Sequence, residues 1–171
     1  MDRDFLLIAR MKRGDDGAIE EFVRKYYPMI LQYCRLHTAN RDDAEDLTQE
    51  TFEKFFRSLG QYQHCGKAAN YLYTIAGNAC RDLYKKPREL SLEDISREMG
   101  TEPERDDAQL LVALALAALP PELREAAVLF YIQGLKQREI AGLLHISLPL
   151  VKYRLGKARA KLQQILSEVD T

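Results

Sequence analysis

The spacing of the apolar residues constrains the fold most, because they recur every three or four positions and nowhere alternate over a sustained run. This is the period of an amphipathic α-helix with one buried stripe, and it argues against β-strands. Three stripes occupy the first half of the chain: Ile19, Phe22, Val23, Tyr26, Ile30 and Cys34; Ala44, Leu47, Thr51, Phe52, Phe55 and Leu59; Leu72, Ile75, Ala76, Ala79 and Leu83. The sequence therefore predicts an all-α fold.

A change in composition divides the chain into two small helical domains. Residues 1–87 carry the three stripes, residues 88–108 are polar and acidic, and residues 109–171 are again rich in helical patterns. We expect the middle segment to be a flexible linker. The net charge is +1 over 1–87, −5 over 88–119 and +5 over 120–166, although the whole chain carries only −1. A basic unit behind an acidic connector is the charge pattern expected of a DNA-binding chain.

The second domain contains a predicted helix-turn-helix in the segment KQREIAGLLHISLPLVKYRL. One helix spans residues 137–144, and the next begins after Ser147, a favoured N-cap, with Pro149 in the first turn, where its missing N–H is harmless. His145 occupies the turn, where glycine is common, and histidine is among the residues that tolerate positive φ. Two helices joined in this way can place the second in the major groove.

Two further helices are expected before this motif. One resumes at Gln109 and runs to Leu119, where Pro120 and Pro121 break the pattern. The other is predicted over residues 123–133 and stops at Gly134, the expected C′ residue.

The last helix has one apolar and one basic face when its residues are placed at 100° intervals. The apolar arc is predicted to be core and consists of Leu148, Val151, Leu155, Ala158, Leu162 and Ile165. The opposite face near the helix start presents Lys152, Tyr153, Gly156 and Lys157. Lysine can reach guanine acceptors or phosphates, so Lys152 and Lys157 are the candidates for base contact, and Arg154 is expected to hold phosphate. A solvated basic face without a ligand is the alternative.

Other classes of protein are disfavoured. No apolar run is long enough to span a bilayer, and the charged N-terminus is unlike a signal peptide, so we expect a cytoplasmic protein with no membrane insertion. The three cysteines, Cys34, Cys65 and Cys80, are an odd and sparse set that indicates reduced thiols rather than a metal site. No glycine-rich phosphate loop, HExxH motif or nucleophile elbow is present, so neither catalysis nor a cofactor is expected.

Three segments, in order along the chain, resemble the extracytoplasmic-function (ECF) group of bacterial sigma factors. DDAEDLTQETFEKFFRSL (42–59) resembles the polymerase-binding helix of that family, and NYLYTIAGNACRDLYKK (70–86) resembles its promoter-opening helix. The segment ALPPELREAAVLFYIQGLKQREIAGLLHISLPLVKYRLGKARAKL resembles its −35-binding domain. The resemblance implies a subunit that binds core RNA polymerase and recognises the −10 and −35 elements of promoter DNA. It also implies a region-2-like domain over 1–87 and a region-4-like domain over 109–171.

The resemblance also implies roles for individual residues, carried over by matching positions. Docking on core polymerase would use Asp46, Gln49 and Glu50. Contacts with the −10 element would come from Tyr62, Tyr71, Asn78, Arg81, Lys85 and Lys86. Tyrosine stands at position 71 where the family usually has tryptophan. Members of the family are often held inactive by an anti-sigma factor, so the resemblance makes such a factor a candidate partner.

Two other functions remain open at this point. A free-standing helix-turn-helix regulator would bind its operator tightly without polymerase, usually as a dimer on two half-sites. A partner-binding protein with no role in transcription would require the basic face to be incidental. Transcription with purified core polymerase separates both from a sigma factor.

Overall fold

A computed structural model describes residues 3–64, 67–84 and 107–169, and within these ranges all regular structure is helical. The chain divides into two compact units, one formed by Met1–Cys34 with Asp42–Pro87 and the other by Arg35–Arg41 with Arg88–Thr171. Most of the expected linker, together with Lys85, Lys86 and Cys65, lies outside the described residues. None of the helices described is long and apolar enough to cross a membrane.

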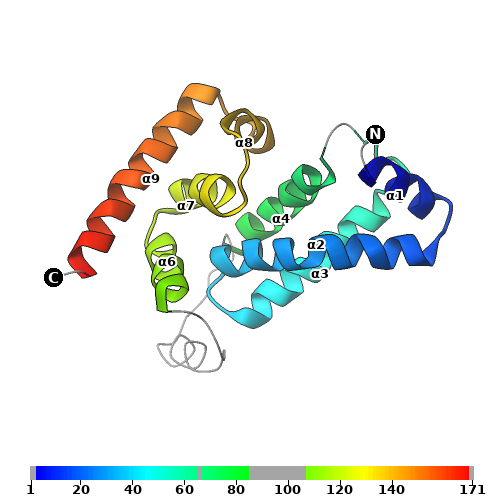
Figure 1. Cartoon of the computed structure of the whole chain (residues 1–171), viewed down its shortest axis with the longest axis horizontal. Helices are drawn as coiled ribbons and strands as arrows, with labels where there is room; N and C mark the ends of the chain where they lie inside the picture. The colour runs from blue at the N-terminus through cyan, green and yellow to red at the C-terminus, as the bar shows by residue number, and fades with distance from the viewer. Residues whose placement is uncertain (1–2, 65–66, 85–106, 170–171) are drawn as a thin grey trace. The chain divides into compact units, whose positions relative to one another are not determined.

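The first unit contains α1 (Arg3–Lys12), all but the last three residues of α2 (Asp16–His37), all but the first residue of α3 (Arg41–Arg57), and α4 (Ala68–Tyr84) (Figure 1). The predicted stripes on α2, α3 and α4 meet in its core, as the helical period requires. The large hydrophobic side chains with no measurable exposure in this core are Phe22, Ile30, Phe55, Leu72 and Tyr73. The core is aromatic: the Phe22 ring stacks on that of Phe55 at a centroid distance of 4.8 Å, and Tyr33 lies 5.4 Å from Tyr73.

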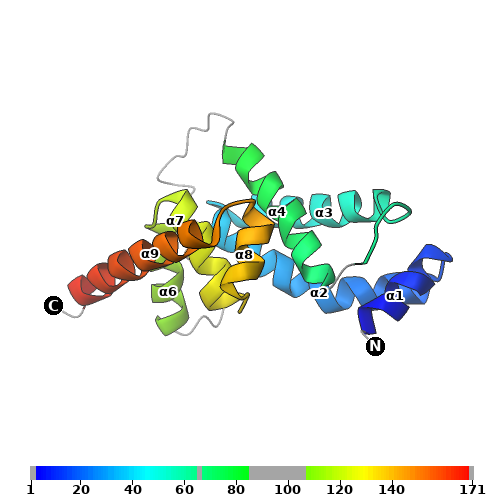
Figure 2. The same ribbon diagram turned by 90° about the horizontal axis from the view of Figure 1, so that it is seen from above.

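Helix α1 lies beside the start of α2 (Figure 2), and charged contacts join each of its ends to α2 or to the residue just before it. Near its start, Asp4 is buried and accepts hydrogen bonds from Lys25 at 2.6 Å and from the Tyr26 hydroxyl. Near its end, Arg10 donates to Asp15 at 2.9 Å, and this guanidinium lowers the pKa of the Asp15 carboxyl. These contacts hold α1 in one orientation against the unit.

Two of the three cysteines belong to this core. Cys34 on α2 and Cys80 on α4 are buried. Hydrogen bonds from Cys80 and Thr48 lower the pKa of the Cys34 thiol, while burial opposes them. Tyr73 is buried in the same core, and this burial raises the pKa of its hydroxyl.

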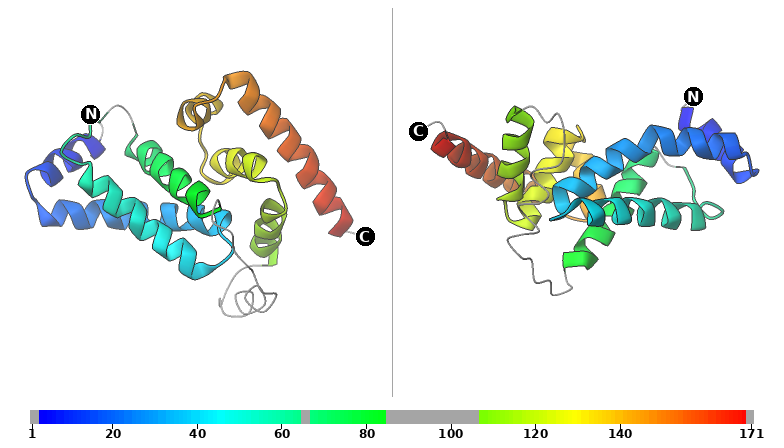
Figure 3. Two further views of the ribbon diagram at one scale, coloured as in Figure 1. Left: turned by 180° about the vertical axis from the view of Figure 1, so that it is seen from behind. Right: turned by 90° about the horizontal axis from the view of Figure 1, so that it is seen from below.

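The second unit contains α6 (Asp107–Ala117), α7 (Pro121–Ala127), the π-helical segment η1 (Val128–Ile132), α8 (Gln137–Leu144) and α9 (Leu148–Val169) (Figure 3). The long α9 packs against α6, α7 and α8. Its predicted core arc is confirmed, with three residues buried and three half-buried. The buried residues are Val151, Leu155 and Ala158, and the half-buried ones are Leu148, Leu162 and Ile165.

The turn of the helix-turn-helix has the predicted geometry. His145 adopts the left-handed conformation, with φ of 55° and ψ of 42°. The Ser147 hydroxyl oxygen accepts a hydrogen bond from the Leu150 backbone N–H at 3.3 Å and so caps α9. On the other helix, Glu139 accepts a hydrogen bond from the Lys136 backbone N–H at 2.9 Å. Local residue chemistry therefore accounts for both the start of α8 and the corner before α9.

The helix predicted over residues 123–133 differs in its second half, which is π-helical. Here the Gln133 N–H donates to the Val128 carbonyl, five residues back, at 3.0 Å. The Leu135 N–H donates to the Leu129 carbonyl at 2.9 Å, across Gly134 with its φ of 70°. Residues 128 and 129 are completely buried. Helical periodicity does not distinguish a π-turn from an α-turn in so short an apolar stretch, so the sequence pattern missed it.

Candidate DNA and polymerase interfaces

The exposed arc of α9 brings together four of the five residues predicted to meet the −35 element. Lys152, Tyr153, Gly156 and Lys157 are all exposed, on the side of the helix opposite its buried stripe. The Lys157 ammonium lies 5.6 Å from the centre of the Tyr153 ring, within the range of a cation–π contact. A Cβ atom built at Gly156 would meet nothing within 4 Å, so the helix backbone is open to an approaching ligand there.

Arg154 lies apart from this arc. Its side chain is only 17% exposed, and its guanidinium is 3.8 Å from the Glu122 carboxylate on α7. The contact joins the first turn of α7 to α9, a pairing that the helical wheel could not indicate. Its role at phosphate stays a prediction, and a phosphate at this position would compete with Glu122.

The rings of Phe55, Tyr62 and Tyr71 form a cluster in the first unit, here called the ring cluster. It contains both aromatic residues predicted for the −10 element. The rings of Tyr62 and Tyr71 stack at a centroid distance of 5.0 Å with an interplanar angle of 29°. Both also contact the buried Phe55, at 5.5 and 5.9 Å. The two tyrosines are half-buried, so each residue remains partly exposed to solvent. A surface of this kind can stack an unpaired base.

Three hydrogen bonds hold Tyr62 and Tyr71 of the ring cluster in place. The Tyr71 hydroxyl is 3.1 Å from Ser58 Oγ, and the Tyr62 hydroxyl is 3.2 Å from His64 Nδ1. The Lys12 ammonium, from the end of α1, donates to the Tyr62 carbonyl at 2.5 Å. Sequence reasoning missed Lys12, because the contact joins residues 50 positions apart and has no local signal.

Asn78 and Arg81 form a second polar feature, on the exposed side of α4. Both side chains are exposed, and the Arg81 guanidinium donates to Asn78 Oδ1 at 2.6 Å. One helical turn separates the two, which explains the contact. An amide beside a guanidinium offers a base or sugar contact next to a phosphate contact. Lys85 and Lys86, predicted to extend this feature, lie outside the described residues.

The residues predicted to dock on polymerase share the outer face of α3. Asp46 and Gln49 are exposed, and Glu50 is half-buried and pairs with Lys54 at 2.6 Å. The opposite face of the same helix supplies its buried stripe, including Thr48 and Thr51 with no measurable exposure. The acidic face is therefore presented outward by a rigidly packed helix.

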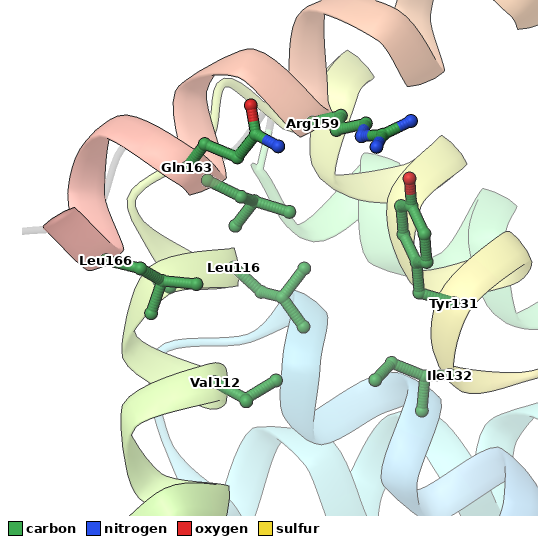
Figure 4. Close-up of a pocket in the computed structure, with 9 residues that line it drawn as sticks. Val112, Leu116, Tyr131, Ile132, Arg159, Gln163 and Leu166 are labelled. Carbon is green, nitrogen blue, oxygen red and sulfur yellow. The ribbon is translucent and has the colours of Figure 1, made fainter.

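The second unit has an apolar groove between α6, η1 and α9 that the sequence did not indicate (Figure 4). Its volume is about 280 Å³. Apolar side chains make up most of its lining, which consists of Val112, Ala115, Leu116, Tyr131, Ile132, Arg159, Leu162, Gln163 and Leu166. Such a lining suits an apolar protein segment rather than DNA. Within the described residues, no group of three or more His, Cys, Asp or Glu side chains could hold a metal ion.

Comparison with known proteins accounts for both units. The family model described as Sigma-70 region 2 matches residues 22–89, and the model described as Sigma-70, region 4 matches residues 109–162. The RNA polymerase sigma factor CarQ of Myxococcus xanthus is 32% identical over 167 residues, covering 94% of this chain and 96% of CarQ. The ECF RNA polymerase sigma factor SigE of Mycolicibacterium smegmatis is 33% identical over 168 residues, and the matched chain spans 65% of its length.

A solved structure agrees with these matches. The sigma factor CnrH, known from Cupriavidus metallidurans, was solved in complex with the cytosolic domain of CnrY. It superposes with a TM-score of 0.78 at 29% identity, over 98% of this chain and 99% of that one. The relatives match both units and their order. The chain therefore belongs to the ECF group of RNA polymerase sigma factors.

Proposed function

We propose that this sigma factor directs promoter-specific transcription by joining core RNA polymerase to promoters with distinct −10 and −35 elements. The observation that carries the proposal is the exposed arc of α9, where Lys152, Tyr153, Gly156 and Lys157 lie together on a capped helix of a helix-turn-helix. Lys152 and Lys157 share this arc with Gly156, where the backbone is exposed. This arrangement suits the major groove, which is lined by hydrogen-bond acceptors and flanked by phosphates. Such a protein works beside DNA and polymerase in the cytoplasm and catalyses no step itself.

We assign the functions to the parts of the chain as follows. Residues 1–87 bind core polymerase through Asp46, Gln49 and Glu50, and they capture the opened −10 strand. The stacked rings of Tyr62 and Tyr71 receive a base, while Asn78 and Arg81 hold the strand by base edge and phosphate. Residues 88–108 connect the two domains, and residues 109–171 read the −35 element.

Transcription with purified core polymerase tests the proposal. The full chain should support initiation at defined promoters with core polymerase and bind the same DNA weakly without it. The double variant Lys152→Ala/Lys157→Ala should keep its affinity for core polymerase and lose initiation by about tenfold or more, because two groove contacts are removed. Lys161→Ala, a matched loss of an exposed lysine farther along α9, should leave initiation within about twofold.

A separate variant tests the proposed contact with core polymerase. Charge reversal at the outer face of α3, by Asp46→Lys with Glu50→Lys, should weaken binding to core polymerase while leaving the fold intact, since neither side chain is buried. Tight binding of the unmodified chain to its promoter without polymerase, with no effect of core enzyme, would instead establish a free-standing regulator.

We further propose that the apolar groove of the second unit receives the apolar face of an anti-sigma factor. Its lining is almost entirely apolar, and Leu166, one of the lining residues, is 37% exposed. Leu166→Glu should reduce binding of a cognate anti-sigma domain while transcription in its absence continues. Unchanged binding by Leu166→Glu would remove the groove from this role.

A further inference from the structure

Tyr153 is the most exposed large apolar side chain among the residues that the structure describes. Its exposed fraction is 60%, against 56% for Val169 and 53% for Phe5. An aromatic ring in water loses the stabilisation that burial would provide, so its place on an otherwise basic arc calls for a ligand. The position on α9 makes DNA that ligand, and the inference therefore depends on the proposed function.

Two neighbouring residues, Lys157 and Gly156, determine how the Tyr153 ring can contact DNA. On one side the Lys157 ammonium lies 5.6 Å from the ring centre, one helical turn along. On the other side Gly156 leaves open space. The cation–π contact holds ring and ammonium next to each other before DNA binds, which lowers the entropy cost of placing both in a groove.

The chemistry of the pair selects its target in the major groove. The 5-methyl group of thymine is the apolar group on that edge of the base pairs, and guanine presents two acceptors, N7 and O6. The Tyr153 ring can contact the thymine methyl group while the neighbouring Lys157 ammonium donates to guanine N7 and O6. We propose that Tyr153 and Lys157 act as one unit that reads a thymine next to a guanine in the −35 element, the ring on the methyl group and the ammonium on the guanine.

The first experiment maps the preference without assuming a promoter. Holoenzyme, assembled from core polymerase and the full chain, selects from duplexes in which only the −35 element is randomised. The unmodified chain should enrich a thymine beside a guanine. Tyr153→Ala should lose the thymine preference, and Lys157→Gln should lose the neighbouring guanine preference by about tenfold. Tyr153→Phe should keep both, since the ring remains. Lys161→Ala is the control for removing charge from α9.

The second experiment removes single atoms from the DNA. Deoxyuridine in place of the thymine deletes only the methyl group and should weaken holoenzyme binding about fourfold, the value for one buried methyl group. Deoxyuridine should have no further effect on Tyr153→Ala. Replacing the guanine by 7-deazaguanine should weaken the unmodified chain and leave Lys157→Gln unchanged.

The outcomes separate this inference from the function on which it depends. If the unmodified holoenzyme enriches no sequence at all, −35 recognition itself is wrong. If it enriches a clear sequence but Tyr153→Ala enriches the same one, the pair does not read bases. A loss of affinity in Tyr153→Phe that is equal for all sequences would show a hydroxyl on phosphate, and it would overturn the methyl contact.

Discussion

The two domains of this sigma factor use aromatic residues in opposite ways. In the first, Phe22, Phe55, Tyr33 and Tyr73 fill the core, Tyr62 and Tyr71 are half-buried, and Phe5 on α1 is the exposed exception among the described residues. In the second, the largest fully buried side chains are aliphatic, among them Leu119, Leu129, Ile140 and Val151. Its tyrosines at 131 and 153 are 49% and 60% exposed.

The difference matches the DNA that each domain would meet. An unpaired strand offers base faces, which stack on rings, so a domain that holds such a strand benefits from rings fixed in a core and open at one edge. Duplex DNA offers base edges, which long side chains on one helix can reach. The first domain therefore positions a surface, whereas the second positions a few projecting side chains. Three changes test this contrast, from the largest expected effect to the smallest.

Truncation of the aromatic core should have the largest effect. Phe22→Ala removes a ring that is completely buried and stacked on Phe55 at 4.8 Å, and should destabilise the first domain by about 3–5 kcal/mol. Hydrogen exchange followed by mass spectrometry should show lost protection in peptides of α2 and α3 and normal protection in α7–α9.

Phe5→Ala is the matched control, because its ring is 53% exposed and its loss should cost little. A uniform loss of protection over both domains in Phe22→Ala would contradict the separation of the two cores.

Removal of one arginine should have a smaller effect, confined to the second domain. Arg124 donates to three carbonyls at the end of α6: Leu116 at 3.1 Å, Ala117 at 2.8 Å and Leu119 at 2.9 Å. The last carbonyls of a helix lack donors within the helix, and here only Leu116 also accepts a backbone hydrogen bond, from the Leu119 N–H at 3.1 Å, among the bonds described for these three carbonyls. Arg124→Ala should therefore cost about 2 kcal/mol and loosen α6. Arg138→Ala, at an exposed position, is the control. Equal exchange rates for α6 in both variants would refute the role of Arg124.

Loss of the contact between α1 and the ring cluster should have the smallest effect on stability and be visible in function. Lys12→Met removes the donor to the Tyr62 carbonyl, an exposed contact worth about 1 kcal/mol. Opening of promoter DNA, followed by permanganate reactivity of unpaired thymines, should slow about threefold to fivefold, while affinity for core polymerase stays unchanged.

Lys12→Arg should restore most of the rate, because a guanidinium also donates to a carbonyl. If Lys12→Arg is as slow as Lys12→Met, the bond to Tyr62 does not position the ring cluster.

Several features of the site were predictable because their causes are local. The period of α9 separated its buried stripe from Lys152, Tyr153, Gly156 and Lys157, and the structure exposes all four. The corner before α9 followed from the tolerance of histidine for positive φ and from the capping chemistry of Ser147. Neither inference needs a residue more than a few positions away.

Of the features that the sequence did not indicate, two depend on contacts between distant segments and one is a local choice between two kinds of helix. Arg154 was placed beside phosphate by its position on the wheel, and only its distance to Glu122 on α7 shows a competing partner. The apolar groove exists because α6, η1 and α9 leave space where they converge. The π-helical turn fits a buried stretch whose apolar pattern is equally compatible with an α-helix.

The sequence by itself determined the helices, their buried faces and the corner of the helix-turn-helix, because periodicity, capping and backbone preference act within one or two turns. Only the tertiary structure decided which side chains meet across helices: Lys12 with Tyr62, Arg154 with Glu122, and the rings that enclose Phe55. The physical reason is that packing joins residues whose separation along the chain leaves no trace in local composition.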